Sequence, residues 1–127
     1  MPRLAKGGKW VYGWVIVGPG LELPIPPAAW QRYGFRAGSE AVLLRGSRTS
    51  EGFGLADGAR LPAHLAGRLI GLARFDAGGR AVLPAAAPVN PGDRLLAVLG
   101  SGYALGFVAR GPIYQLALEH DEVAVFV

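Results

Sequence analysis

Residues 25–46 are IPPAAWQRYGFRAGSEAVLLRG, and a shorter segment of the same kind, LPAAAPVNPGDRLLAVLG, occupies residues 83–100. Each segment begins with an aliphatic residue and a proline, and each later has a glycine-bearing turn before an apolar run. Proline cannot donate a hydrogen bond to a β-ladder, but it suits the first turn of a helix. The longer segment therefore predicts about two turns of helix over residues 26–33, a left-handed cap at Gly34 sealed by Phe35, and a following strand.

The two segments belong to a longer internal repeat. Residues 37–47 and 91–101 align without a gap, and three pairs of glycines keep one offset, namely Gly38 with Gly92, Gly46 with Gly100, and Gly52 with Gly106. From the first proline to the turn glycine there are 12 residues in the first copy and 8 in the second. The second helix is therefore shorter by about one turn. We expect one domain over residues 1–127, with repeats at about 10–58 and 68–119 and a C-terminal strand at 122–127.

Apolar runs rich in β-branched and aromatic residues predict the strands of each repeat. The first strands lie at 10–17 and 68–75, and the last lie at 52–56 and 103–109, where the second can extend into 113–119. Residues 57–67 predict a surface loop or a short helix between the repeats. Four short strands cannot close a core, whereas two repeats can close a barrel without exposed edges. The predicted fold is all-β with one or two short helices, a single barrel formed by two tandem repeats.

A fixed order of turn and proline motifs runs through both copies. In the second copy these residues are Asp76, Gly79, Arg80, Leu83, Pro84, Pro91, Gly92 and Asp93, and in the first they are Ile25, Pro26, Gly34, Phe35, Ala37, Gly38 and Ser39. The pattern resembles the AbrB/SpoVT-type swapped-hairpin domain, with both copies in one chain as in MraZ-like proteins. The resemblance implies a barrel of intertwined hairpins and the role of a non-enzymatic, DNA-binding transcriptional regulator.

The same resemblance implies which side chains contact DNA, because members of that family use basic residues on the first strand, at the Gly-Arg turn and at the start of the helix. Five arginines are predicted to do so: Arg32, Arg36, Arg48, Arg74 and Arg80. Arginine suits this role because its planar fork donates two parallel hydrogen bonds to phosphates or base edges. The two halves are unequally basic, since the second helix carries no charge and the first copy has a glutamate, and no arginine, in its Gly-Arg turn.

The composition predicts a folded, basic protein. Hydrophobic residues make up 51%, charged residues 17%, and the net charge is +4, so the surface can attract phosphate backbones. The absence of cysteine excludes disulfides, thiolate metal sites and cysteine nucleophiles. No apolar run approaches the ~18 residues of a membrane-spanning helix. We expect a cytoplasmic protein that does not contact a membrane.

Two other functions stay open. The polar stretch RGSRTSEGFG (45–54) can form an anion-binding nest from the amides of Gly46, Gly52 and Gly54, with Ser47 and Thr49 donating to a phosphate oxygen. This would make the protein a sensor of small anions.

The second alternative is a protein-interaction or homo-oligomerisation barrel that has lost DNA binding. Strand alternation places Trp10, Tyr12 and Trp14 on one face, which indicates core or a subunit interface. The unequal arginines of the two halves favour the same alternative.

No catalytic or metal-binding constellation is visible in the sequence. His64 and His120 are isolated, with no second histidine or carboxylate at metal-ligand spacing. The serines have no matching histidine and aspartate, and no G-x-S-x-G motif occurs. The sequence therefore predicts no metal, no cofactor and no enzymatic activity.

Overall fold

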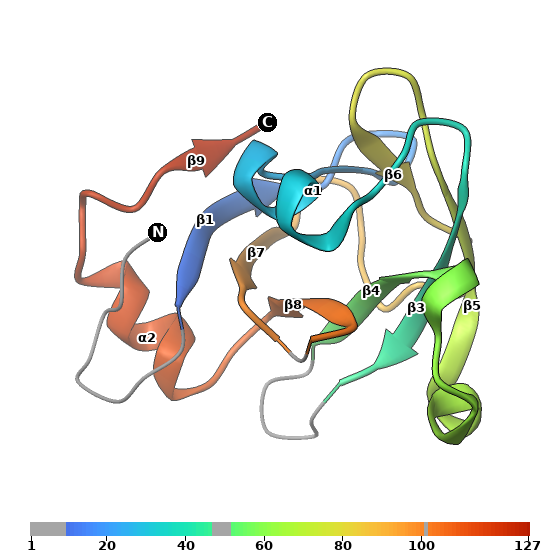
Figure 1. Ribbon diagram of the computed structural model, residues 1–127. Helices are drawn as coiled ribbons and strands as arrows, with labels where there is room; N and C mark the ends of the chain where they lie inside the picture. Colours follow the sequence, from blue (N-terminus) through green and yellow to red (C-terminus); the bar gives the residue numbers. More distant parts are fainter. Residues whose placement is uncertain (1–9, 47–51, 101) are drawn as a thin grey trace.

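The computed structural model describes residues 10–46, 52–100 and 102–127. Within these ranges, nine strands form one mixed sheet in the order β2-β6-β5-β3-β4-β8-β7-β1-β9, and the sheet curves into a nearly closed barrel (Figure 1). The strands are β1 (Val11–Ile16), β2 (Glu22–Pro24), β3 (Glu40–Arg45), β4 (Phe53–Asp57), β5 (Leu69–Phe75), β6 (Arg80–Val82), β7 (Arg94–Val98), β8 (Ala104–Val108) and β9 (Val125–Phe126). The prediction of a mostly β barrel with short helices is confirmed at this level.

The helix predicted after the first Ile-Pro pair is present as α1 (Pro27–Tyr33). Gly34 ends it in the left-handed conformation, with φ 66° and ψ 31°. The Phe35 amide donates to the Trp30 carbonyl at 3.1 Å, and the Phe35 ring stacks on Tyr33 with 5.7 Å between centroids. The cap and its aromatic seal are therefore as predicted. The connector at 57–67 forms two 3₁₀ helices, η1 (Gly58–Arg60) and η2 (Ala63–Arg68).

Strands of the first half of the chain pair with strands of the second half. β1 pairs with β7, β5 pairs with β3, β2 pairs with β6, and β4 pairs with β8, all antiparallel. β1 skips Tyr12 in its register with β7, and β5 skips Ile70 in its register with β3. The two halves are thus interlocked, and a bulge lies at the same place in each long strand pair.

The registers of the β3–β4 and β7–β8 hairpins change one of the glycine pairs that the sequence alignment predicted, that of Gly52 with Gly106. Leu44 pairs with Gly54 in the first hairpin, and Val98 pairs with Gly106 in the second. Gly106 therefore corresponds to Gly54 rather than to Gly52, because the second hairpin is two residues shorter. Gly54 and Gly106 also pair with each other between β4 and β8.

The main core fills the barrel with side chains from both halves. Phe53 stacks on Phe107 with 5.1 Å between centroids, and Phe75 lies 4.4 Å from Phe35 and 5.1 Å from Trp30. Because Trp30 lies in α1 and Phe35 directly follows its cap, while Phe75 belongs to β5, this aromatic cluster joins the helix of the first half to a strand of the second.

Two smaller apolar clusters lie outside the barrel. α2 (Pro112–Leu118) packs on the outer side chains of β1, β7 and β8, and η2 packs on those of β3 and β4. The predicted extension of a strand into 113–119 is therefore wrong, because these residues form α2. Pro112 suits a helix start, and Ile113, Leu116 and Ala117 share one helical face against the sheet.

Three further expectations differ from the structure. The C-terminal strand predicted at 122–127 covers only Val125–Phe126, which run parallel to β1. No helix forms at residues 85–89, where a shortened helix was predicted; residues 85–86 form a turn and 87–88 a bend. Tyr12 and Trp14 are both buried, but they belong to different clusters, since the bulge at Tyr12 shifts the alternation by one residue.

Among the described residues, no helix has the length and apolar character needed to span a membrane.

Candidate functional site

Three of the predicted DNA-contacting arginines lie at one corner of the barrel. Arg36 belongs to the turn after α1, whose Gly38 amide donates to the Phe75 carbonyl at 2.6 Å. The Phe75 amide in turn donates to the Ser39 carbonyl at 3.1 Å, and Arg74 directly precedes Phe75. The side chains of Arg36 and Arg74 are both exposed. Figure 1 shows this turn beside the tip of the β5–β6 hairpin.

Arg80 begins β6 at the end of that hairpin. The hairpin turn is held by the Asp76 carboxylate, which accepts hydrogen bonds from the amides of Gly78 at 2.8 Å and Arg80 at 3.0 Å. The guanidinium of Arg80 donates to the main-chain oxygen of Val127 at 2.8 Å and is half-buried. We call Arg36, Arg74 and Arg80 the basic corner. Two carboxylates lie beside it, namely Asp76 in the hairpin turn and Glu40, which lies opposite Arg74 in the strand register.

Arg32 lies on the exposed side of α1, and its charge acts on two phenols. Burial raises the pKa of Tyr33 to about 12 and also raises the pKa of Tyr12, while the nearby Arg32 acts in the opposite direction on both groups. The Tyr12 hydroxyl is buried and has no hydrogen-bond partner among the residues that the structure describes. No described contact joins Arg32 to the basic corner, and Arg48 lies outside the described residues.

The raised pKa of Tyr33 predicts a loss of stability in alkali. The unfolded phenol ionises near pH 10, whereas the folded phenol stays neutral to about pH 12. Its contribution is therefore fully present below pH 10 and is lost as the pH rises from 10 to 12. We expect the free energy of unfolding of Tyr33→Phe to fall less steeply over this interval, measured by urea denaturation. Parallel curves for the two proteins would contradict this assignment.

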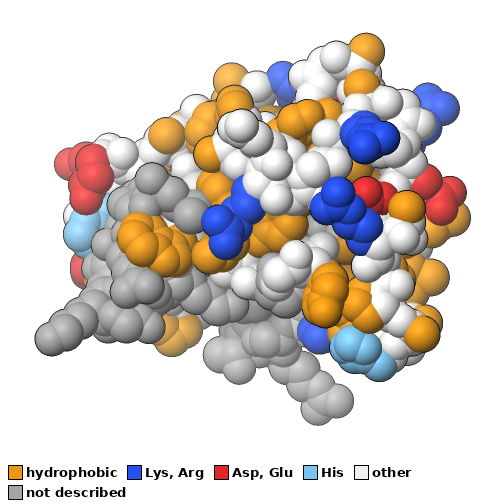
Figure 2. All heavy atoms as spheres, in the orientation of Figure 1, with side chains coloured by type: hydrophobic (Ala, Val, Ile, Leu, Met, Phe, Trp, Pro, Cys, Tyr) orange, Lys and Arg blue, Asp and Glu red, His pale blue; other side chains and the backbone are white. Residues whose placement is uncertain are grey.

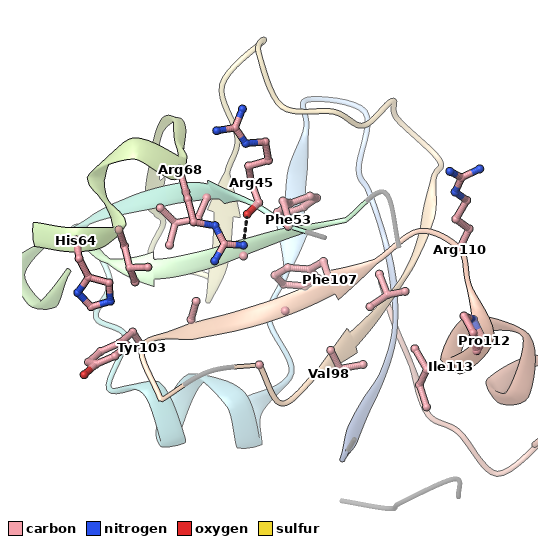
Figure 3. Close-up of a pocket in the computed structure, with 18 residues that line it drawn as sticks. Arg45, Phe53, His64, Arg68, Val98, Tyr103, Phe107, Arg110, Pro112 and Ile113 are labelled. Carbon is pink, nitrogen blue, oxygen red and sulfur yellow. Dashed lines mark hydrogen bonds between the residues drawn. The ribbon is translucent and has the colours of Figure 1, made fainter. Parts of the chain in front are cut away.

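A groove of about 520 Å³ lies on the outer face of the barrel, over the β4–β8 pair (Figure 3). Phe53 and Phe107 point into the core, so Gly54 and Gly106, one position along each strand, face outward and form the floor. η2 forms one wall, and Pro112 and Ile113 at the start of α2 line the other side. The site therefore depends on both halves of the chain.

The described side chains that line this groove include four basic ones, Arg45, His64, Arg68 and Arg110, and no carboxylate. Arg68 Nη2 donates to the Arg45 carbonyl at 2.7 Å, and Arg45 Nη2 donates to the Gly67 carbonyl at 3.2 Å. In Figure 3 the guanidinium of Arg45 extends outward, whereas that of Arg68 turns back onto β3. These bonds tie η2 to the end of β3 and leave most of the N–H donors of both arginines for other partners.

The predicted anion nest at 45–54 is only partly described. The Gly46 amide donates to the Gly52 carbonyl at 3.2 Å, so the prediction that it would face an anion is wrong. Ser47 and Thr49 lie outside the described residues. What sequence reasoning missed is the groove beside this loop. Its sequence signal was a glycine in the middle of each of two strands that pair, because such glycines mark a close approach to a backbone or a ligand.

The described residues contain no group of three or more potential metal ligands. His120 Nδ1 lies 2.7 Å from Glu122 Oε1 at the surface, and hydrogen bonds from a backbone amide and from His120 lower the pKa of Glu122.

In comparisons with protein-family models, with curated proteins and with solved structures, nothing matches this chain.

Proposed function

We propose that the chain is a non-enzymatic, AbrB-like DNA-binding regulator whose barrel consists of two equivalent halves. The strand exchange supports this, because each half lends its first strand to the third strand of the other. Bulges at Tyr12 and Ile70 occupy matching positions in the two exchanged pairs. Such an arrangement is the one-chain counterpart of two intertwined hairpin domains.

The basic corner is the observation that carries the DNA-binding role. It brings Arg36, Arg74 and Arg80 from two distant parts of the sequence onto segments joined by backbone hydrogen bonds. The matching positions of the other half hold Ile16 and Glu22 in place of Arg74 and Arg80, by strand register. One chain therefore offers one basic corner, and we propose that DNA is contacted from that side, with Arg32 adding charge from α1.

The test is the anisotropy of labelled duplex DNA, titrated with the protein at ~50 mM and ~200 mM salt. Four neutralised phosphates would weaken binding by roughly a hundredfold between these conditions. We expect Arg36→Ala combined with Arg74→Ala to weaken binding at low salt and to flatten the salt dependence.

The matched control is Arg94→Ala, which removes an exposed arginine at the start of β7. In the strand register, Arg94 occupies the position in the second half that Glu40 occupies in the first, away from the basic corner. It should leave both quantities nearly unchanged. No binding at ~50 mM salt and micromolar protein, or equal losses in both variants, would exclude the basic corner as a DNA site.

A second candidate function, self-association, is favoured by an apolar patch on the outer face of β5 and β6. Leu69, Leu72 and Val82 are 46%, 51% and 39% exposed. By register, the counterparts of Leu69 and Leu72 in the other half are Val11 and Trp14, which α2 covers. No helix of the described chain therefore covers the outer face of β5 and β6, whereas α2 covers the matching face of β1.

Self-association would be detected by light scattering over a range of protein concentrations. We expect the wild-type mass to rise with concentration and Leu72→Glu to remain a monomer, because a buried unpaired carboxylate opposes association. Val125→Glu, at an exposed position on β9, is the control and should associate like the wild type. A wild-type mass that stays monomeric throughout would remove this candidate.

A further inference from the structure

We infer that the groove over the β4–β8 pair is a binding site for a small aromatic carboxylate. The ring would lie on the floor formed by Gly54 and Gly106, and the carboxylate would be bound by Arg68. This site uses none of the residues of the basic corner, so it stands independently of the proposed DNA binding.

The floor of the groove is formed by two glycines with the side chains of Val98 and Ala104 close beside them. Gly54 and Gly106 pair directly across β4 and β8, and neither has a side chain to cover the strands. A Cβ atom at Gly106 would lie 3.0 Å from Val98 Cγ2, and one at Gly54 would lie 3.2 Å from Ala104 Cβ. Glycine inside a strand costs stability, and it is typical of places where a ligand approaches the backbone closely. The paired glycines therefore keep the floor shallow between Val98 and Ala104, and a planar ring would lie on the surface that these four residues form.

The walls and the size match a small molecule. Leu65 of η2 lies on one side and Ile113 of α2 on the other, with Leu44 and Val98 along the neighbouring strands. The volume of about 520 Å³ falls within the range of about 300–1,000 Å³ that is usual for small-ligand sites. An apolar body of one or two fused rings fits these dimensions.

The charge of the lining specifies the head group. Arg45, His64, Arg68 and Arg110 border the groove, and no described acidic side chain lines it. Arg68 is held in place by its bond to the Arg45 carbonyl, and its other donors stay available to a bound anion. A planar guanidinium fixed beside an apolar surface binds a carboxylate through parallel hydrogen bonds. The ligand is thus an acid rather than a neutral or cationic aromatic compound.

The experiment uses 2-naphthoate as the probe and 2-naphthylmethanol as its uncharged counterpart. Titration of the ¹⁵N-labelled full-length chain should produce saturable shifts of the Gly54 and Gly106 amides with naphthoate, and much weaker binding of the alcohol. Arg68→Gln should weaken naphthoate binding about tenfold or more, since a hydrogen bond to a charged group is lost. Gly54→Val should abolish it by filling the floor.

Arg94→Gln is the matched control, because Arg94 is exposed and lies outside the groove. It should bind naphthoate like the wild type. Thermal unfolding establishes whether the Gly54→Val protein is folded. If it is not folded, the amide shifts of the wild type and the affinity of Arg68→Gln still test whether naphthoate binds in the groove. Absence of shifts at both glycines, equal affinity for the acid and the alcohol, or equal affinities of Arg68→Gln and Arg94→Gln would overturn the proposal. Loss of DNA binding in basic-corner variants would leave naphthoate binding intact.

Discussion

Phe75→Ala is expected to lower the free energy of unfolding by about 3–5 kcal/mol. Phe75 is fully buried and contacts the rings of Phe35 and Trp30 at 4.4 and 5.1 Å between centroids. Its removal leaves a cavity between α1 and β5, where the two halves of the chain meet. Because stabilities of single domains are about 5–15 kcal/mol, this change removes a large fraction of the total.

Urea denaturation followed by tryptophan fluorescence measures the effect, and Leu72→Ala on the same strand is the control. Leu72 is 51% exposed, so its truncation should cost less than about 0.5 kcal/mol. Similar costs for the two variants would contradict the placement of the Phe75 ring in the barrel core.

The second large effect is expected for Trp14→Ala, again about 3–5 kcal/mol but on the outside of the barrel. Trp14 is 2% exposed, its ring meets Tyr114 of α2 edge-on at 4.9 Å, and Arg94 lies over it at 4.1 Å. Without this ring, α2 loses the surface on which it packs. We therefore expect the amides of 112–118 to exchange with solvent much faster than those of β4 and β8.

Hydrogen exchange measured by mass spectrometry separates local release of α2 from global unfolding. Val125→Ala, at an exposed position on the neighbouring strand β9, should leave the exchange of 112–118 unchanged. A Trp14→Ala protein in which α2 remains as protected as the barrel strands would contradict the role given to this ring.

Local chemistry decided which elements could be predicted from the sequence. Pro27, Gly34 and Phe35 specify the start, the end and the seal of α1 without help from the rest of the chain, and the structure has all three. The strands at 10–17 and 68–75 were equally clear, because long β-branched and aromatic runs favour a pleated surface whatever they pair with.

The segment at 113–119 shows where this reasoning fails. Its apolar residues fit both a strand and a helix. Pro112 favours a helix start, and packing on the apolar outer face of β1 and β7 stabilises the helix. The prediction that Tyr12 shares a strand face with Trp14 is wrong for a related reason. The bulge at Tyr12 is set by pairing with β7, some 80 residues away, and not by the neighbours of Tyr12 in the sequence.

The candidate sites divide in the same way. Arg36, Arg74 and Arg80 could be chosen from motif positions, but their meeting at one corner depends on the hydrogen bonds between the 34–39 turn and β5. Arg45 and Gly106 lie in different halves of the chain and share no motif, so the groove that they line could be found only once the pairing of β4 with β8 was known.

The exchange of strands between the two halves also governs how the chain reaches its fold. Val15 must find Leu95, and Leu43 must find Leu55 and Gly71, so the long pairs cannot form until most of the chain is present. In a chain emerging from the ribosome, β1 and β2 would have no partners until β7 and β6 had been synthesised. The fold therefore has a high contact order, and we expect it to form slowly. The same strand pairs would form if the first half of one molecule closed with the second half of another. In such an exchange the connector at 57–67 would act as the hinge, and a chain cut there would give two fragments that pair with each other.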